Sequence, residues 1–387
     1  EANLTTFFLP LGILLFLKEK FWLAGIVLGL NLFSYHSAKF VTPLALIATV
    51  VYTKQSVKKY WPALATFGLF LMLTFYTFFL GGGARIGERS ITKGALEAAF
   101  EERTRSLSLF HNKYQIIVER FLGNYVTYLS PQFFFSEGPR EGTYGMIPGR
   151  GILYWFVIPF FIGVRKLFYQ DKYKRELLLL AFWVFASPIP AALASGVGYS
   201  ANRVAGMMPA FEILLALGAI EFFGWLKNRK ILLYGFCSLV LILFISFMED
   251  YFIQSPYKIG KSMLYGNLEV ADWVAQNAKG KNVVVDRSLS EPHIYFAFAE
   301  KFAPGLYQNE SRSWNYREQK LGWLDQLGKY SLGKYTFKDL NQNDYKNSAL
   351  LIGRPEDFLG SVTPLKTFLY PDGSPAVLVV DPNAKTF

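Results

Sequence analysis

Long apolar runs, each broken by a few polar or charged residues, fill roughly the first 250 positions of the chain. A helix needs about 20 consecutive apolar residues to cross a bilayer, and about eight segments approach that length. Five of these segments are strong and three are shorter: 61–80, 151–168, 177–195, 204–226 and 231–248, then 4–17, 21–36 and 40–53. This pattern predicts a polytopic transmembrane helix bundle over residues 1–250, interrupted by one long loop at 81–150.

Residues 251–387 have the pattern of a water-soluble domain. Helices are expected where apolar residues recur at helical spacing, and strands where short apolar runs lie between turn residues. The expected elements are helices at 266–279 and 291–302 and strands at 282–286, 348–353, 365–370 and 376–381. Asp372-Gly373 lies between the last two strands and indicates a hairpin. The chain is therefore predicted to be mainly α, with a small α/β domain at its C-terminal end.

The charges support a membrane protein and exclude a nucleic-acid-binding one. Only 18% of the residues are charged and the net charge is +11, but the excess lies in short loops between apolar runs. Cationic short loops remain in the cytoplasm. The loops concerned carry Lys18, Lys20, Lys54, Lys58, Lys59, Arg165, Lys166, Lys172, Lys174, Arg175, Lys227, Arg229 and Lys230. We therefore expect a multi-pass protein of the cell membrane whose long loop and α/β domain are extracytoplasmic.

Three cations stand near the expected outer ends of helices, and they are candidates for binding a phosphate. They occur in Tyr35-His36-Ser37-Ala38-Lys39, Pro148-Gly149-Arg150-Gly151 and Tyr199-Ser200-Ala201-Asn202-Arg203. Arg binds phosphate with two parallel hydrogen bonds, Lys acts as a point charge, and glycines permit close backbone approach. Structural roles are the alternative: Lys39 and Arg150 extending to the interface, His36 capping a helix, and Arg203 at a helix start. We predict that the three cations converge on one pocket.

Other chemistry is sparse in this sequence. Glu212 lies two turns inside the predicted helix 204–226, where we expect a buried carboxylic acid that its surroundings keep neutral. A zinc signature and a Ser/His/Asp set are absent from the sequence, and no acid–base pair stands out. No cofactor is therefore predicted, and a divalent metal stays open without a motif that supports it. The single Cys237 excludes a disulfide within the chain.

Several motifs follow one another along nearly the whole chain. They are Tyr35-His36-Ser37-Ala38-Lys39 with Pro43-Leu44, His111-Asn112-Lys113, Ser130-Pro131-Gln132-Phe133, Pro148-Gly149-Arg150-Gly151, Arg203 to Pro209 and Glu291-Pro292-His293-Ile294-Tyr295. In these motifs the chain resembles the bacterial GT-C glycosyltransferases related to protein O-mannosyltransferases and lipid A aminoarabinose transferases. The resemblance implies transfer of a sugar from a polyprenyl-phosphate donor to an acceptor at the extracytoplasmic face, with inversion at the anomeric carbon.

The same resemblance implies roles for particular residues. Lys39, Arg150 and Arg203 would bind the donor phosphate. The residues expected to line the site are Glu1, Asn3, Tyr35, His36 and Asn202. The family's catalytic carboxylate lies in the first external loop, upstream of residue 1 here. We therefore expect this chain by itself to be an inactive fragment whose partners are the bilayer and the lipid-linked donor.

Two other classes of function remain open at this point. A transporter or flippase of a lipid-linked or anionic solute would require polar groups at mid-bilayer, and it commonly shows internal repeats. The third class is a scaffold that presents the C-terminal domain to a protein partner without catalysis.

Overall fold

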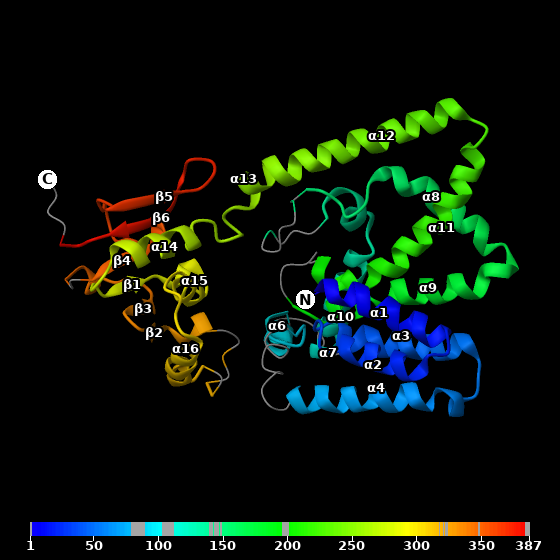
Figure 1. The fold of residues 1–387 in the computed structure, drawn as a ribbon, viewed down its shortest axis with the longest axis horizontal. Helices are drawn as coiled ribbons and strands as arrows, with labels where there is room; N and C mark the ends of the chain where they lie inside the picture. Colours follow the sequence, from blue (N-terminus) through cyan, green and yellow to red (C-terminus); the bar gives the residue numbers. More distant parts are fainter. Residues whose placement is uncertain are drawn as a thin grey trace. The chain divides into compact units, whose positions relative to one another are not determined.

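The computed structural model describes residues 2–78, 90–102, 112–138, 142, 147, 149–195, 201–316, 318–319, 321, 324–346 and 349–383. The chain divides into two compact units, Glu1–Phe247 and Met248–Phe387. The described part of the first unit is built from helices, and the second unit contains a sheet with helices packed on it (Figure 1). The chain is thus mainly helical and ends in a small sheet domain, as predicted.

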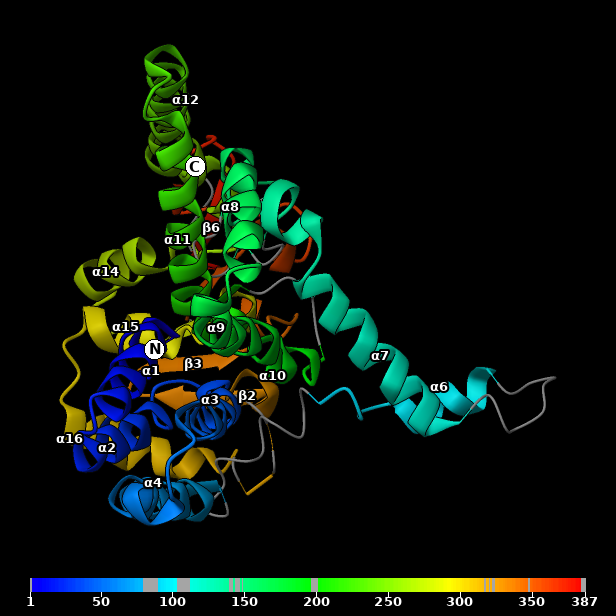
Figure 2. The ribbon, with the colours of Figure 1, turned by 90° about the vertical axis from the view of Figure 1, so that its right-hand side faces the viewer.

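The helices in the described part of the first unit are α1 (Ala2–Leu17), α2 (Phe21–Asn31), α3 (Ala38–Thr53), α4 (Val57–Thr77), α6 (Ala95–Glu102), α7 (Lys113–Tyr128), α8 (Ile158–Phe168), α9 (Lys174–Ala186), α10 (Pro188–Ala192), α11 (Met208–Leu226) and α12 (Lys230–Glu249). Short 3₁₀ or π turns precede or follow several of them, namely η2 (Gln132–Ser136), η4 (Trp155–Val157), η5 (Asp171–Tyr173) and η6 (Ala201–Met207). In Figure 2, α6 packs at the N-terminal end of α7.

Close helix packing in this unit depends on glycine. α2 packs against both α1 and α4, and a Cβ at Gly25 would lie 1.8 Å from Thr66 Oγ1. α8 packs against α11, where a Cβ at Gly163 would lie 2.4 Å from the Gly218 carbonyl oxygen. Small residues that bring helix backbones together are typical of helix pairs in membranes.

The expectation of about eight membrane spans is wrong for the described residues. Three helical stretches there are long and apolar enough to cross a membrane: Asp171–Ala192, Ala201–Leu226 and Lys230–Ile259. The predicted span 151–168 fails because residues 151–154 are not helical, which leaves η4 and α8. α2 has 11 residues, and at about 1.5 Å per residue it covers roughly half of a bilayer core.

α12 is the clearest membrane candidate of the three. None of its residues is buried, and its exposed side chains include Ile231, Ile242 and Ile245. One stripe does pack on the unit, since the Phe236 ring lies 5.2 Å from that of Phe222. A helix that is apolar on all sides suits lipid contact. Together, the three stretches of sufficient length and apolarity are compatible with a membrane-associated protein.

The second unit contains a six-stranded sheet in the order β2-β3-β1-β4-β6-β5. β1 pairs in parallel with β3 and β4, and the remaining pairings are antiparallel. The strands are β1 (Val283–Val285), β2 (Lys329–Leu332), β3 (Tyr335–Lys338), β4 (Leu350–Gly353), β5 (Lys366–Leu369) and β6 (Pro375–Val380), and the helices are α13 (Ser255–Ile259), α14 (Asn267–Asn277), α15 (His293–Ala299) and α16 (Pro304–Ser311). β1 is an unbroken apolar run because side chains cover both faces of the sheet.

All six elements expected in this unit are confirmed: α14, α15, β1, β4 and the two strands of the β5–β6 hairpin. At the hairpin turn, Asp372 Oδ1 accepts from the backbone N–H of Ser374 at 2.9 Å, and Gly373 has a φ of 82°. The β2–β3 hairpin was not predicted. Its signal was the alternation of buried and exposed residues on either side of Gly333-Lys334.

Candidate functional site

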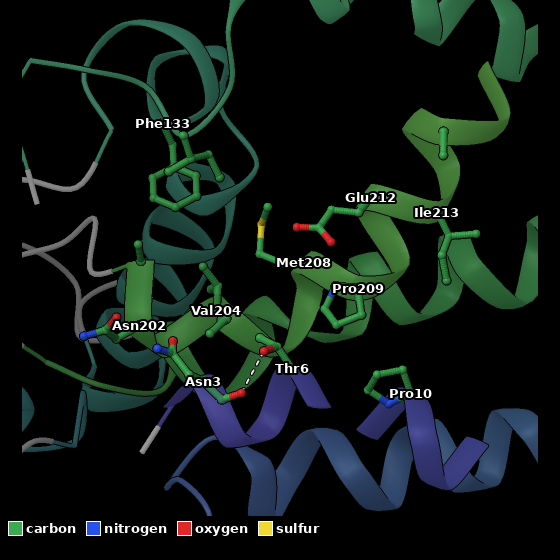
Figure 3. A pocket seen from close by; sticks show the side chains of 14 residues that line it. Asn3, Thr6, Pro10, Phe133, Asn202, Val204, Met208, Pro209, Glu212 and Ile213 are labelled. Carbon is green, nitrogen blue, oxygen red and sulfur yellow. Dashed lines mark hydrogen bonds between the residues drawn. The ribbon is translucent and has the colours of Figure 1, made fainter. Parts of the chain in front are cut away.

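The first unit contains a cavity of about 770 Å³ with three described walls (Figure 3). α1 contributes Asn3, Thr6 and Pro10, which recur at helical spacing and so share one face of the helix. The second wall comes from η6 and the first turns of α11: Ala201, Asn202, Val204, Ala205, Met208, Pro209, Glu212, Ile213 and Ala216. Phe133 and Ile152 form the third wall.

Backbone contacts hold the third wall in place. Ser130 Oγ accepts a hydrogen bond from the Phe133 N–H at 3.1 Å, and the Leu153 N–H donates to the Phe134 carbonyl at 2.7 Å. A Cβ at Gly151 would lie 2.4 Å from that same Phe134 oxygen. The glycine after Arg150 therefore permits the close backbone approach expected of it.

A buried hydrogen bond positions η6, which carries Asn202. Trp183 on α9 donates from Nε1 to the Gly206 carbonyl at 2.7 Å. Because Trp183 is buried, this bond forms in an apolar environment where leaving the indole N–H unpaired would be costly. The η6 wall is thereby attached to α9.

The turn that carries Tyr35 to Lys39 is anchored by a buried polar network. Asn31 Nδ2 donates to Thr42 Oγ1 at 2.8 Å, and Ser34 Oγ donates to Asn31 Oδ1 at 2.9 Å. The hydroxyls of Thr5 and Ser34 lie 2.8 Å apart. Since these four side chains are buried, their mutual satisfaction fixes the junction of α1, α2 and α3.

The structure brings two of the expected site residues together at the cavity. Asn3 and Asn202 both line it, and Figure 3 shows them on the side away from Glu212. Tyr35 and His36 are not among the described lining residues, and their rings lie 6.1 Å apart. Glu1 lies outside the described residues.

The three cations have different surroundings, and none is a described lining residue of the cavity. Arg150 Nη2 donates to Ser246 Oγ on α12 at 2.9 Å, and Nη1 donates to the Tyr154 hydroxyl at 3.4 Å. Lys39 and Arg203 are half-buried. Neither makes a hydrogen bond or ion pair within the part of the chain that the structure describes.

The segments of Lys39 and Arg203 are neighbours. A Cβ at Gly206 in η6 would lie 3.7 Å from Val41 Cγ1 in α3, so the first turn of α3 approaches η6. Lys39 is the second residue of α3, and Arg203 is the third residue of η6. Both cations therefore stand near the N-terminal ends of adjacent elements, and η6 also supplies Asn202 to the cavity.

Glu212 is a site residue that the sequence interpretation missed. The expectation of a buried carboxyl group is wrong, because Glu212 is exposed and lines the cavity. In Figure 3 its carboxylate points away from the axis of α11 into the open space. It has no hydrogen-bond or ion-pair partner among the residues that the structure describes. The available signal was its spacing from Ala205, Met208 and Ala216, which places all four on one helix face.

A second cavity, of about 510 Å³, lies in the sheet domain. Its carboxylates are already bonded: Asp286 accepts from the Ser288 and Leu340 N–H groups, and Asp357 accepts from the Arg354 N–H. Among the described residues, no group of three or more His, Cys, Asp or Glu is arranged to hold a metal ion. These carboxylates stabilise the loops that follow the strands.

Comparison with known proteins supplies no relative. No family model, curated protein or solved structure matches the chain.

Proposed function

We propose that this protein is a membrane glycosyltransferase of the GT-C type that uses a polyprenyl-phosphate-linked sugar as its donor. The observation that carries the proposal is the cavity at the N-terminal ends of α1 and α11, where Asn3 and Asn202 meet apolar walls. Carboxamides hydrogen-bond sugar hydroxyls, and apolar walls pack against the C–H faces of a sugar ring. The apolar helices of the unit suit a lipid-borne substrate.

The reaction is a single displacement. An acceptor oxygen attacks the anomeric carbon, the bond from that carbon to the phosphate oxygen breaks, and the phosphate leaves with the electron pair. The acceptor proton passes to a base. Attack from the side opposite to the leaving group inverts the configuration.

Lys39 and Arg203 are our candidates for stabilising the leaving phosphate. Cations placed where negative charge develops lower the barrier, because they are already oriented before the reaction. Both lack a partner in the described structure and are therefore available to an anion. Arg150 is our third candidate, although part of its hydrogen-bonding capacity is used on Ser246.

The position of the two carboxamides supports an enzyme over a transporter. Asn3 lies in the first turn of α1 and Asn202 lies at the start of the apolar stretch Ala201–Leu226, whereas Glu212 lies near the middle of that stretch. A transporter site is expected near the middle of its spanning helices. The extracytoplasmic location of this end belongs to the proposal and follows from the cationic loops at the opposite helix ends.

Vesicles that contain the protein purified from its native membrane test this function. They are supplied with polyprenyl-phosphate-linked sugars and a membrane extract as the source of acceptor, and the released polyprenyl phosphate is measured by mass spectrometry. Arg203→Ala should slow release by about 100-fold. The matched control is Arg229→Ala, because the Arg229 guanidinium lies over the Trp225 ring at 4.2 Å near the far end of α11.

Two outcomes contradict the proposal. Movement of intact donor across the membrane without release of polyprenyl phosphate would identify a transporter. If the correctly folded protein neither moves the donor across the membrane nor releases polyprenyl phosphate, the result would favour a scaffold. Equal rates for Arg203→Ala and Arg229→Ala would remove Arg203 from the mechanism.

A further inference from the structure

We propose that the cavity between α1 and α11 is the subsite for the sugar ring of the donor, and that Glu212 makes it selective for sugars without negative charge. This inference rests on the proposed function and adds the class of sugar. It assigns the donor phosphate to a position outside the cavity.

A single ionisable side chain among the described lining residues sets the charge of the cavity. Glu212 is the only ionisable side chain among the described lining residues, which include no Lys or Arg. Its carboxylate has no partner in the described chain. A cavity with one unpaired carboxylate repels an anionic group and accepts a neutral one that can donate hydrogen bonds.

The described lining of the cavity also offers more hydrogen-bond acceptors than donors. Pro10 has no N–H, so the Thr6 carbonyl four residues earlier in α1 has no α-helical donor at that position. The Thr6 hydroxyl donates to the Asn3 carbonyl at 2.7 Å, so its proton is already in use. An ionised carboxylate only accepts. Lining donors therefore come mainly from the carboxamides of Asn3 and Asn202.

Sugar hydroxyls match this set of groups. Two neighbouring hydroxyls can donate to the two carboxylate oxygens of Glu212, and hydroxyls on the other side of the ring can accept from a carboxamide N–H₂. The cavity volume of about 770 Å³ lies in the range of small-molecule sites. The unpaired cations Lys39 and Arg203 stand on neighbouring segments outside the lining, where the phosphate can meet them. The arrangement separates the neutral part of the donor from its charged part.

Binding of simple glycosides tests the inference without any need for catalysis. The protein, purified from its native membrane and placed in lipid nanodiscs, is titrated with the methyl glycosides of glucose, galactose and mannose. The methyl glycosides of the three corresponding uronic acids are titrated in the same way. Saturation-transfer NMR measures the binding of each glycoside. Each pair differs by a carboxylate in place of a hydroxymethyl group. We expect at least one neutral glycoside to bind at least about tenfold more tightly than its uronic acid.

Two substitutions on the same helix sharpen the test. Glu212→Gln should reduce that difference to less than about threefold, by weakening the neutral glycoside and admitting the acid. Glu221→Gln is the control, since Glu221 lies outside the described lining and pairs with Lys166 at 2.6 Å. This variant should bind like the wild type. If Glu212→Gln does not fold, the inference is still tested by Glu212→Asp and by the comparison of neutral glycosides with uronic acids on the wild-type protein.

The inference is overturned if no neutral glycoside binds, if the uronic acids bind as tightly as the neutral sugars, or if Glu212→Gln leaves the difference unchanged. A failure of the proposed function would give a different result from a failure of this inference. Selective glycoside binding without release of polyprenyl phosphate would leave a sugar-binding protein that is not a transferase. Release without this selectivity would remove only the assignment of the cavity.

Discussion

The Asn31 side chain donates a hydrogen bond to Thr42 at 2.8 Å, and both residues are fully buried among the apolar helices of the first unit. Because Ser34 gives its single proton to Asn31, the neighbouring Thr5 hydroxyl donates to Ser34. The network joins three helices through groups that would be costly to bury alone. It also fixes the turn that carries Lys39, which links the fold to the candidate phosphate site.

Thr42→Val should destabilise the protein by about 1–3 kcal/mol, because it leaves the Asn31 amide without its acceptor. The matched control is Thr74→Val, since the buried Thr74 hydroxyl donates only to the Phe70 carbonyl of its own helix in the described structure. The melting temperature of the detergent-solubilised protein, followed by size-exclusion chromatography, measures both. Equal losses for the two variants would refute a special role for the network.

Gly218→Ala should destabilise the α8–α11 pair by about 1–3 kcal/mol, because the new Cβ would lie 2.0 Å from the Phe160 carbonyl oxygen. Gly224 lies on the same helix and has open space at its Cβ position. Gly224→Ala should therefore be neutral or stabilise by up to about 1 kcal/mol. The same melting assay separates them, and a harmless Gly218→Ala would show that the helices lie further apart.

Arg150 and Ser246 should be energetically coupled. A hydrogen bond to a charged group contributes about 1.5–3 kcal/mol, so a double-mutant cycle of Arg150→Ala and Ser246→Ala should give a coupling energy of at least about 1 kcal/mol. Ser238→Ala on α12 is the control, because Ser238 is exposed and has no partner in the described chain. A coupling energy near zero would release Arg150 for another role, including phosphate binding.

His293 should make the sheet domain sensitive to acid. Its ring is buried against Trp314 and Tyr330, and burial lowers the pKa of His293 to about 4. Tyr330 donates to Asp325, and His293 Nδ1 lies 3.2 Å from the Tyr330 oxygen. The neutral ring is therefore the form that fits the core.

The sign of the pH effect follows from this shift. Between the unfolded pKa of about 6.5 and the folded value, the unfolded chain binds more protons, so stability falls as the pH falls. At pH 5 the loss from His293 should be about 2 kcal/mol relative to pH 7.5. Hydrogen exchange at β1 and β3, corrected for the intrinsic rate, measures it. His293→Phe should remove this component, and parallel pH profiles for the two proteins would contradict the assignment.

The sequence by itself predicted α14, α15, β1, β4, β5 and β6 of the sheet domain, but not α16, β2 or β3. The spacing of apolar residues and the residue types at turns act locally. Asp372-Gly373 therefore predicts its hairpin, and the Val283–Val285 run predicts a central strand. The same local signals identified α12 as a segment able to span a membrane. The lengths of the helical segments were less well determined. The predicted span 151–168 is shorter in the structure because the backbone N–H groups of 152–153 bond to the Phe133 and Phe134 carbonyls instead of to a helix.

Only the tertiary structure decided what the candidate site contains. Asn3 and Asn202 were expected to line one site from motif positions, but their meeting depends on how α1 packs against η6. The accessibility of Glu212 and the contact of Arg150 with Ser246 depend equally on neighbours distant in sequence. A side chain's charge is a property of the residue, whereas its burial and partners are properties of the packing around it.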